Sequence, residues 1–186
     1  MKKAVIDMGT NSTRLAVAAW NGGNLDMLYN EVAETRLGEG MGEEHQIRPV
    51  PLARNVETVR RFVQKAQELG AVEVRITATS AVRDAVNQET VQQAIRQAAG
   101  IPLEVLPGTK EARLSYLGAS GDFLHLERPL AVLDIGGGST ELVYPVQGGV
   151  HGASVNMGAV RLLEHPELRP KVVQVLQGLR EEALPG

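Results

Sequence analysis

The sequence predicts an α/β protein that contains one α/β domain and the beginning of a second. Two observations support this fold class. First, a three-strand meander is followed in turn by a helix, a strand, a helix, a strand and a helix, and the meander pattern then starts again. Second, both meanders carry the same motif, because DMGTNSTRL at residues 7–15 resembles DIGGGSTEL at residues 134–142.

The repeated motif keeps its small and acidic residues and changes its charge at one position. Aligning the two copies matches Asp7 with Asp134, Gly9 with Gly136, Ser12 with Ser139 and Leu15 with Leu142. Arg14 then falls opposite Glu141. The separation of the copies is too long for a solenoid repeat and indicates a duplicated half-domain.

The composition excludes several function classes. The chain of 186 residues is 43% hydrophobic and has six aromatic residues, too few for a surface that stacks nucleic-acid bases. A net charge of -3 makes duplex DNA or an anionic membrane an unexpected partner. The chain has no cysteine, which excludes disulfides and thiolate metal sites. With no secretory signal and no apolar run of about 20 residues, a cytoplasmic location is expected.

The first part of the chain reads as strands separated by glycine-rich turns. The expected strands are 3–8, 12–20 and 25–34. The sequence NGGN at 21–24 predicts a hairpin turn. Residues 37–51 hold three glycines and two prolines and are expected to form a loop.

Helices and strands alternate in the middle of the chain. From Leu52 to Leu69 apolar residues recur every three or four positions, which predicts an amphipathic helix ending at Gly70. The next elements are expected to be a strand at 72–81, a helical turn at 80–87, a helix at 88–100 and a short strand at 102–108. A helix at 109–121, with Thr109 as its N-cap, precedes the second meander, whose last hairpin turns at Gly148 and Gly149. The remainder is expected to be helical apart from its prolines.

Both copies of the motif predict an anion-binding turn. A turn of glycine and small hydroxyl residues exposes backbone N–H groups with no large side chain in front of them. In the second copy, Gly136, Gly137 and Gly138 permit positive φ and a close approach of phosphate, and Ser139 and Thr140 add hydroxyl donors. A glycine-rich hairpin alone is an ordinary turn, but a tight turn does not require the preceding aspartate that both copies share. Neither copy is a Walker loop or a dinucleotide fingerprint.

The charge difference between the copies predicts different chemistry. Arg14 can bind phosphate oxygens through its planar guanidinium, whereas Glu141 would repel them. Glu141 therefore implies either a hard cation such as Mg²⁺ or a proton-transfer role, with Asp134 as the second acid. If the two turns face each other across a cleft, they hold one phosphate chain from both sides.

Six segments of the chain together resemble a known family, and they are AVIDMGTNSTRLAV, ETRLGEGM, TATSAVRDAVN, PGTKEARLSYLGA, VLDIGGGSTELV and VNMGAVRLLE. The family that they resemble is the exopolyphosphatase and guanosine pentaphosphate phosphatase (Ppx/GppA) family, part of the actin-like, sugar-kinase and chaperone ATPase superfamily. Their order and spacing match the family along nearly the whole chain, which makes the resemblance specific.

The resemblance implies an actin-like (ribonuclease H-like) domain at residues 1–126 and the incomplete N-terminal part of a second actin-like domain at 127–186. The boundary is expected near 125–129, and the two domains are expected to close over the phosphate chain. The implied reaction is hydrolysis of a terminal phosphoanhydride, in inorganic polyphosphate or in guanosine pentaphosphate (pppGpp), with Mg²⁺ as cofactor. Both substrates remain open, and a homodimer is compatible with the incomplete second lobe.

The resemblance also assigns roles to residues. The family's catalytic glutamate falls on Glu111, which by itself would read as a charge at a helix N-terminus, and its acidic, metal-binding pair falls on Asp134 and Glu141. Arg83 matches the arginine of its motif, and Asn87 either reaches the same cleft or caps locally. Phosphate-binding residues are expected at Gly9, Thr10, Asn11, Ser12, Arg14, Arg83, Gly136, Gly137, Gly138, Ser139 and Thr140. Glu111 would hold or deprotonate the attacking water.

Two other functions are compatible with the same residues. The turns can hold polyphosphate or an alarmone without turnover if the incomplete lobe does not exclude water, which gives a catalytically weak binding module. Paired phosphate turns also suit an ATP-dependent kinase or ATPase of the same superfamily. The rate of phosphate release from polyphosphate, compared with that from ATP, separates these functions.

Overall fold

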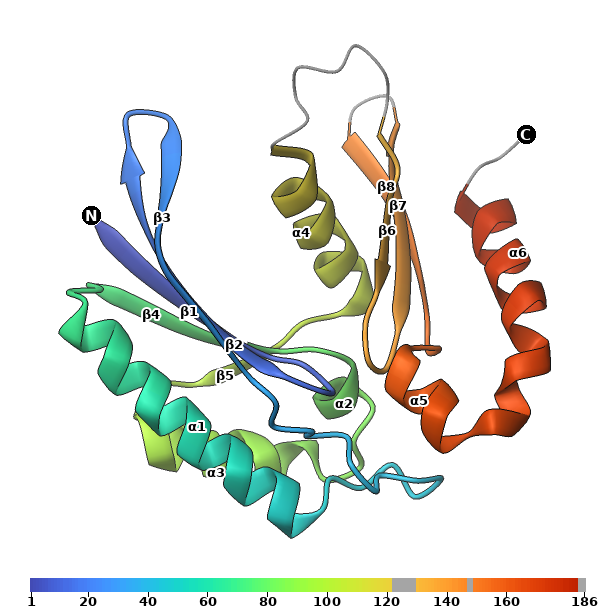
Figure 1. Cartoon of the computed structure of the whole chain (residues 1–186), viewed down its shortest axis with the longest axis horizontal. Helices are drawn as coiled ribbons and strands as arrows, with labels where there is room; N and C mark the ends of the chain where they lie inside the picture. The colour runs from blue at the N-terminus through green and yellow to red at the C-terminus, as the bar shows by residue number, and fades with distance from the viewer. Residues whose placement is uncertain (122–129, 147–148, 184–186) are drawn as a thin grey trace. The chain divides into compact units, whose positions relative to one another are not determined.

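The computed structural model of the chain describes residues 1–121, 130–146 and 149–183 (Figure 1). Its contacts divide the chain into two compact units, Met1–Val105 and Leu106–Gly186. Each unit has its own sheet and is described by itself. Among the described residues, no helix is both long enough and apolar enough to cross a membrane.

The first unit contains a five-stranded mixed sheet in the order β3-β2-β1-β4-β5. Its strands are β1 (Lys2–Met8), β2 (Thr13–Asn21), β3 (Asn24–Ala33), β4 (Glu73–Ala78) and β5 (Leu103–Val105). The first three form the predicted antiparallel meander, and β4 and β5 join β1 in parallel. The predicted hairpin turn is confirmed, because Gly22 and Gly23 both have positive φ, at 58° and 110°.

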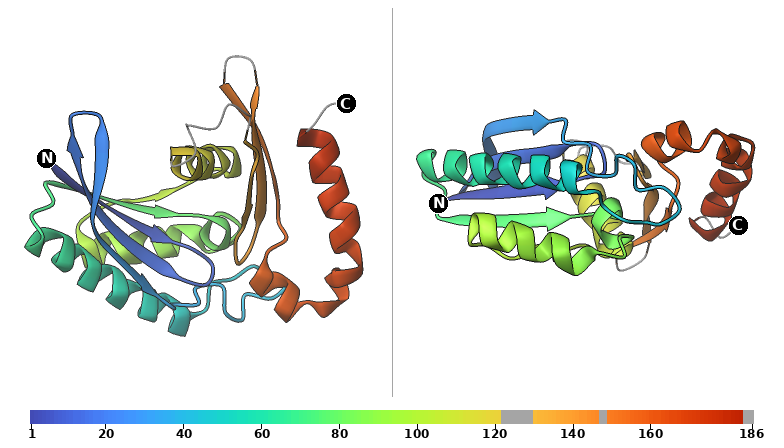
Figure 2. Two further views of the ribbon diagram at one scale, coloured as in Figure 1. Left: turned by 45° about the horizontal axis from the view of Figure 1, so that its top comes forward. Right: turned by 90° about the horizontal axis from the view of Figure 1, so that it is seen from below.

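Two amphipathic helices cover one face of this sheet, α1 (Pro49–Glu68) and α3 (Gln88–Ala99) (Figure 2). They end where predicted, with Gly70 and Gly100 at φ 78° and 68°. The core between sheet and helices includes Ile6, Leu15, Val17, Val59, Phe62, Ile76, Val82 and Ile95. Helix α1 starts three residues before the predicted Leu52, since Pro49 fits the first helical position, where no N–H bond is lost. The helical turn predicted at 80–87 is limited to α2 (Ser80–Arg83).

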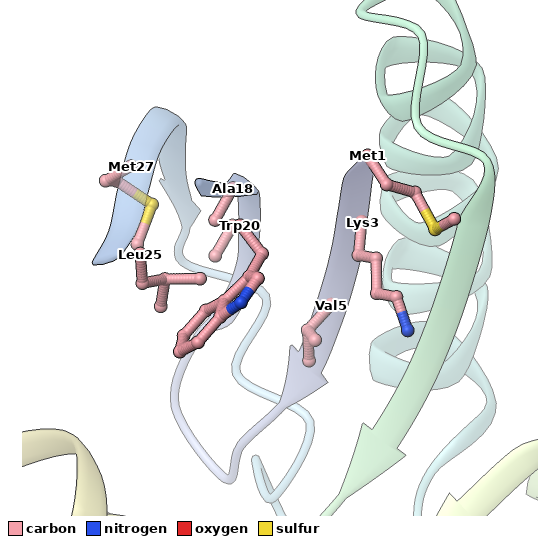
Figure 3. Close-up of a pocket in the computed structure, with 8 residues that line it drawn as sticks. Met1, Lys3, Val5, Ala18, Trp20, Leu25 and Met27 are labelled. Carbon is pink, nitrogen blue, oxygen red and sulfur yellow. The ribbon is translucent and has the colours of Figure 1, made fainter. Parts of the chain in front are cut away.

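The opposite face of the meander is apolar and open. A surface hollow of about 610 Å³ lies on it, lined by Met1, Val5, Trp20, Leu25 and Met27 among others (Figure 3). Trp20 is 61% exposed, so an aromatic side chain faces solvent on a strand whose alternate residues, such as Leu15 and Val17, are buried in the core. The meander therefore has one packed face and one unpacked face.

The second unit contains a three-stranded antiparallel sheet in the order β6-β7-β8. Its strands are β6 (Val132–Ile135), β7 (Thr140–Val146) and β8 (Gly149–Val155). Helix α4 (Gly108–Ser120) lies on one face and α6 (Val172–Ala183) on the other (Figure 1). Helix α5 (Ala159–Glu164) and a 3₁₀ helix (Pro166–Lys171) connect β8 to α6. The predicted turn residue Gly148 lies outside the described residues.

Helix α4 packs with the second unit, although the sequence places it in a first domain that ends at residue 126. A Cβ on Gly152 of β8 would lie 3.3 Å from the Cβ of Ala112, so glycine allows the helix to approach the sheet closely. The expected boundary segment 125–129 lies outside the described residues, and the domain limits themselves stay a prediction.

Candidate functional site

The first of the two turns that are predicted to bind phosphate, residues 9–12, connects β1 to β2. The Gly9 N–H donates to the Ser12 carbonyl at 2.9 Å and closes the turn. A Cβ on Gly9 would lie 3.0 Å from that carbonyl oxygen, which makes a larger residue unfavourable there. Gly9 does not have positive φ, so space and not backbone conformation explains this glycine.

The loop that follows β3 forms hydrogen bonds with the carbonyl groups of the first turn. The Thr10 carbonyl accepts from the Gly38 N–H at 2.9 Å, and the Asn11 carbonyl accepts from the Arg36 N–H at 2.7 Å. Within residues 1–121, the N–H groups of Thr10 and Asn11 donate to no protein acceptor. These two N–H groups are therefore not used within the protein, as an anion-binding turn requires.

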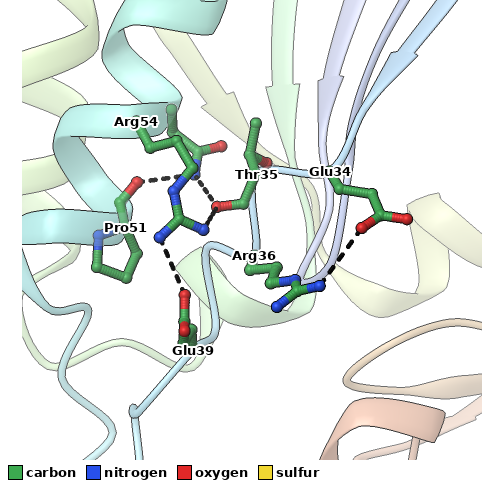
Figure 4. Close-up of polar contacts among 7 residues, drawn as sticks. Glu34, Thr35, Arg36, Glu39, Pro51 and Arg54 are labelled. Atoms are coloured by element: carbon green, nitrogen blue, oxygen red, sulfur yellow. Dashed lines mark hydrogen bonds and ion pairs between the residues drawn. The ribbon is translucent and has the colours of Figure 1, made fainter.

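A buried polar network fixes this loop to the turn. The Thr13 hydroxyl bonds the Thr35 hydroxyl at 2.9 Å and the Asn55 side-chain carbonyl at 2.8 Å. Arg54 donates to the Thr35 carbonyl and to Glu39, both at 3.1 Å (Figure 4). Sequence reasoning missed these supporting residues. The segment ETRLGEGM, at residues 34–41, was the available signal.

The second turn that is predicted to bind phosphate, residues 136–139, repeats this geometry between β6 and β7. The Gly136 N–H donates to the Ser139 carbonyl, again at 2.9 Å. None of Gly136, Gly137 and Gly138 has positive φ, so the turn does not use the left-handed backbone that these glycines would permit. Glycine at these three positions instead leaves the turn without side chains.

Helix α5 holds the carbonyl groups of the second turn. The Ala159 N–H donates to the Gly136 carbonyl and the Val160 N–H to the Gly137 carbonyl, each at 2.9 Å. The Arg161 Nε donates to the Gly138 carbonyl at 3.2 Å. In the part of the chain that the structure describes, the Gly137 and Gly138 N–H groups donate to no protein acceptor. Both turns thus use their carbonyls internally and leave N–H groups for another molecule.

The hydroxyl-bearing residues of the second turn are buried. Ser139 is 2% exposed and Thr140 is 4% exposed. The Thr140 hydroxyl donates to the Met157 carbonyl, so its proton is used within the protein. Phosphate binding at Thr140 would therefore have to involve its backbone.

The three predicted catalytic acids belong to the second unit. Asp134 and Glu141 are directly opposite each other across β6 and β7 and so point to the same face of the sheet. The Asp134 carboxylate accepts from the Ser115 hydroxyl at 2.6 Å, and the Glu141 carboxylate accepts from the Ser154 hydroxyl at 2.7 Å. Glu111 lies one helical turn before Ser115 on α4, which places both on one side of the helix.

The first turn of α4 differs from its prediction. The N-cap position is Pro107, whose carbonyl accepts from the Lys110 and Glu111 N–H groups at 2.9 and 3.0 Å. Thr109 is therefore inside the first turn and is not the N-cap. Glu111 remains in the first turn, where the helix dipole favours a carboxylate.

The predicted cationic residues belong to the first unit. Arg14 is exposed at the start of β2, directly opposite Asp7. Arg83 ends α2, and its Nε lies 4.0 Å from the Asp84 carboxylate. The Asn87 side chain bonds the backbone N–H and carbonyl of Ile47 at 3.0 and 2.9 Å and makes no cap hydrogen bond to α3, so the expectation that it caps locally is wrong.

A metal at this site would rely on few protein ligands. Over residues 1–121, 130–146 and 149–183, no group of three or more histidine, cysteine, aspartate or glutamate side chains is arranged to hold a metal ion. Asp134 and Glu141 supply two carboxylates on one face. This fits Mg²⁺, which commonly uses one or two carboxylates together with water and substrate phosphates.

Comparisons with known proteins agree on one family. A model of the Ppx/GppA phosphatase family matches residues 4–178. Exopolyphosphatase 2 of Mycobacterium tuberculosis is 35% identical over 170 residues, which are 87% of this chain and 53% of that protein. The chain thus spans about half the length of this curated relative.

Solved structures show the same likeness. An exopolyphosphatase from Cytophaga hutchinsonii is 26% identical with a TM-score of 0.86, covering 97% of this chain and 61% of its own. The Aquifex aeolicus PPX-GPPA enzyme is 29% identical with a TM-score of 0.78, covering 98% and 62%. The ethanolamine utilization protein EutJ from Carboxydothermus hydrogenoformans, at 17% identity and a TM-score of 0.52, shares the fold alone over 91% of this chain and 57% of its own. The fold is actin-like, as predicted.

Proposed function

We propose, because the chain belongs to the Ppx/GppA phosphatase family, that it hydrolyses the terminal phosphoanhydride bond of inorganic polyphosphate or of guanosine pentaphosphate with Mg²⁺ as cofactor. The observation that carries this proposal is the matched hydrogen bonding of the two turns. Each turn closes through the same glycine-to-serine bond and has its carbonyls bonded to protein, while N–H groups remain for an anion.

The turns supply binding and orientation for phosphate. The N–H groups of Thr10, Asn11, Gly137 and Gly138 are proposed to donate to phosphate oxygens. Arg14 adds a charged planar donor beside the first turn. Donors fixed by a rigid backbone need little rearrangement when charge develops during phosphoryl transfer, so they favour the transition state.

Asp134 and Glu141 are proposed to hold Mg²⁺. When bound, the ion offsets charge on the transferring phosphoryl group. Glu141 is 1% exposed, and a carboxylate so deeply buried opposite a second carboxylate is stabilised by a nearby positive charge. The pairing of Asp134 with Glu141 across the two strands is therefore compatible with a bound cation.

Glu111 is proposed to orient or deprotonate the attacking water. Its place in the first turn of α4 fixes its backbone, and the helix itself is joined to the acid-bearing sheet through Ser115. General-base assistance of this kind contributes about 10²- to 10⁴-fold in rate.

Phosphate release from polyphosphate in the presence of Mg²⁺ tests the proposal. Wild-type protein should release phosphate, and Glu111→Gln should lower the rate about 10²-fold or more without loss of the fold. Glu164→Gln, an exposed acid on α5 of the same unit, serves as the matched control and should retain wild-type activity. Equal release by wild type and Glu111→Gln would refute the role of Glu111.

A binding module is the second candidate function, because the N–H groups of the two turns could hold an anion without any action of the three acids. Calorimetric titration with polyphosphate and with guanosine pentaphosphate distinguishes the two functions. Tight binding without phosphate release supports the module. Faster release from ATP than from either substrate would instead favour an ATPase.

A further inference from the structure

A hydroxyl group from a different element bonds each carboxylate of the acid pair. Ser115, on α4, donates to Asp134 Oδ2 at 2.6 Å. Ser154, on β8, donates to Glu141 Oε1 at 2.7 Å. Ser154 is also directly opposite Glu141 across β7 and β8, so Asp134, Glu141 and Ser154 form one row across the three strands. The two serines therefore flank the acids from the helix and from the third strand.

The acids need such partners, because two like charges directly opposite each other in a sheet repel. The burial of Glu141 strengthens this repulsion by removing water. A serine hydroxyl stabilises a carboxylate and fixes its rotation, and it occupies one carboxylate oxygen. In each acid, the serine bond fixes the position of one carboxylate oxygen and therefore the direction in which the other oxygen points.

The same serine bond sets the position of α4 on the sheet. Ser115 contacts β6, and Ala112 meets Gly152 of β8, where a Cβ would lie only 3.3 Å away. These contacts fix the helix at two points on two different strands. Glu111, one turn before Ser115, is carried by the segment that they fix.

We propose that Ser115 and Ser154 are positioning residues that hold Asp134 and Glu141 in the orientation needed to bind a divalent cation, an inference that rests on the proposed function. Ser115 additionally holds the helix of Glu111 in register with Asp134. Neither serine touches the phosphate chain in this proposal, and both act through the carboxylates.

Direct cation binding tests the proposal without requiring turnover. Mn²⁺ is titrated into the full chain and followed by electron paramagnetic resonance, and Mg²⁺ is then used as a competitor. Ser115→Ala and Ser154→Ala should each weaken Mn²⁺ affinity about 10- to 100-fold, as loss of a partner of a metal ligand generally does. Ser115→Thr and Ser154→Thr keep the hydroxyl and should restore most of the affinity. In polyphosphate hydrolysis, Ser115→Ala should lower kcat more than it changes KM.

Ser120→Ala is the matched control, because Ser120 is a buried serine of the same helix, 8% exposed. It should leave Mn²⁺ affinity unchanged. Alanine variants that lose thermal stability but bind Mn²⁺ like the wild type would overturn the proposal, while the proposed function would stand. Wild-type protein that binds no Mn²⁺ and no Mg²⁺ would remove the cation site of the proposed function and the positioning role with it.

Discussion

Asp134 lies directly opposite Glu141 across β6 and β7, so the second turn is flanked by two like charges. At the equivalent position of the first turn, Asp7 lies opposite Arg14. In the first copy of the motif, the residue paired with the aspartate across the strands is therefore an arginine. In the second copy, the residue at that register position is another acid. We therefore expect an added cation to stabilise the second copy more than the first.

Mg²⁺ should therefore raise the thermal midpoint of the chain through Asp134 and Glu141. A ligand that binds the folded state alone stabilises it by about 2.7 kcal/mol at 100 times its dissociation constant. Asp134→Asn should abolish most of this Mg²⁺-dependent shift in a thermal melt. Glu167→Gln, an acid of the same unit that is 68% exposed, should leave the shift intact. The same loss of shift in both variants would indicate non-specific ion binding.

Gly158→Ala should destabilise the second turn. A Cβ at this position would lie 2.5 Å from the backbone carbon and oxygen of Gly137, and backbone atoms cannot move aside as a flexible side chain can. Overpacking of this kind costs about 1–3 kcal/mol. Urea denaturation should show the loss, together with weaker polyphosphate binding.

Gly118→Ala, in the same unit, should instead increase the stability of the protein. Gly118 lies inside α4, and a Cβ there would meet no atom within 4 Å. Alanine is the better helix former by about 0.5–1 kcal/mol, so this variant should be more stable than wild type. If both alanine variants lose stability, close packing is not what requires glycine at residue 158.

Arg14→Ala should weaken polyphosphate binding in a salt-dependent manner. Arg14 is exposed beside the first turn, and a guanidinium that contacts phosphate displaces counterions from the polyanion. Binding isotherms at several salt concentrations should show lower affinity and a shallower dependence on salt. Arg60→Ala removes an exposed arginine of α1 that pairs with Glu57, and it should change neither quantity. Identical salt dependence in the two variants would contradict a phosphate contact at Arg14.

The sequence predicts the site's turns better than it predicts their supports. The strands around both turns follow from alternating apolar residues and glycine, which are local signals. The packing of α4 on β6 and β8 depends on Ser115 and Gly152, whose partners lie many residues away. In a sequence, a serine that bonds a carboxylate cannot be distinguished from a solvated serine. The left-handed backbone of Arg36, at φ 46°, also has no signal in the sequence. Tertiary contacts decide such features, and a single sequence does not reveal them.

The acid stability of the first unit should depend on Tyr29. Its hydroxyl donates to the Glu31 carboxylate at 2.6 Å, and this bond, followed by that from Arg61, lowers the pKa of Glu31 below its ordinary 4.5. The same bond is the largest cause that raises the pKa of Tyr29 above 10.0. The Glu31 contribution is present above the unfolded pKa and is lost as pH falls through the lower folded pKa. The Tyr29 contribution is present below pH 10 and is lost as pH rises through its higher folded pKa.

Tyr29→Phe should lower the free energy of unfolding at pH 7 only slightly, because solvent screens this surface cluster. The difference from wild type should shrink as the pH falls through the lowered folded pKa of Glu31, because protonation of Glu31 weakens the bond in the wild type as well. Urea denaturation of both proteins at pH 7 and pH 3 measures the two differences. A difference that does not change with pH would mean that the Tyr29 hydroxyl stabilises the fold without acting through the Glu31 carboxylate.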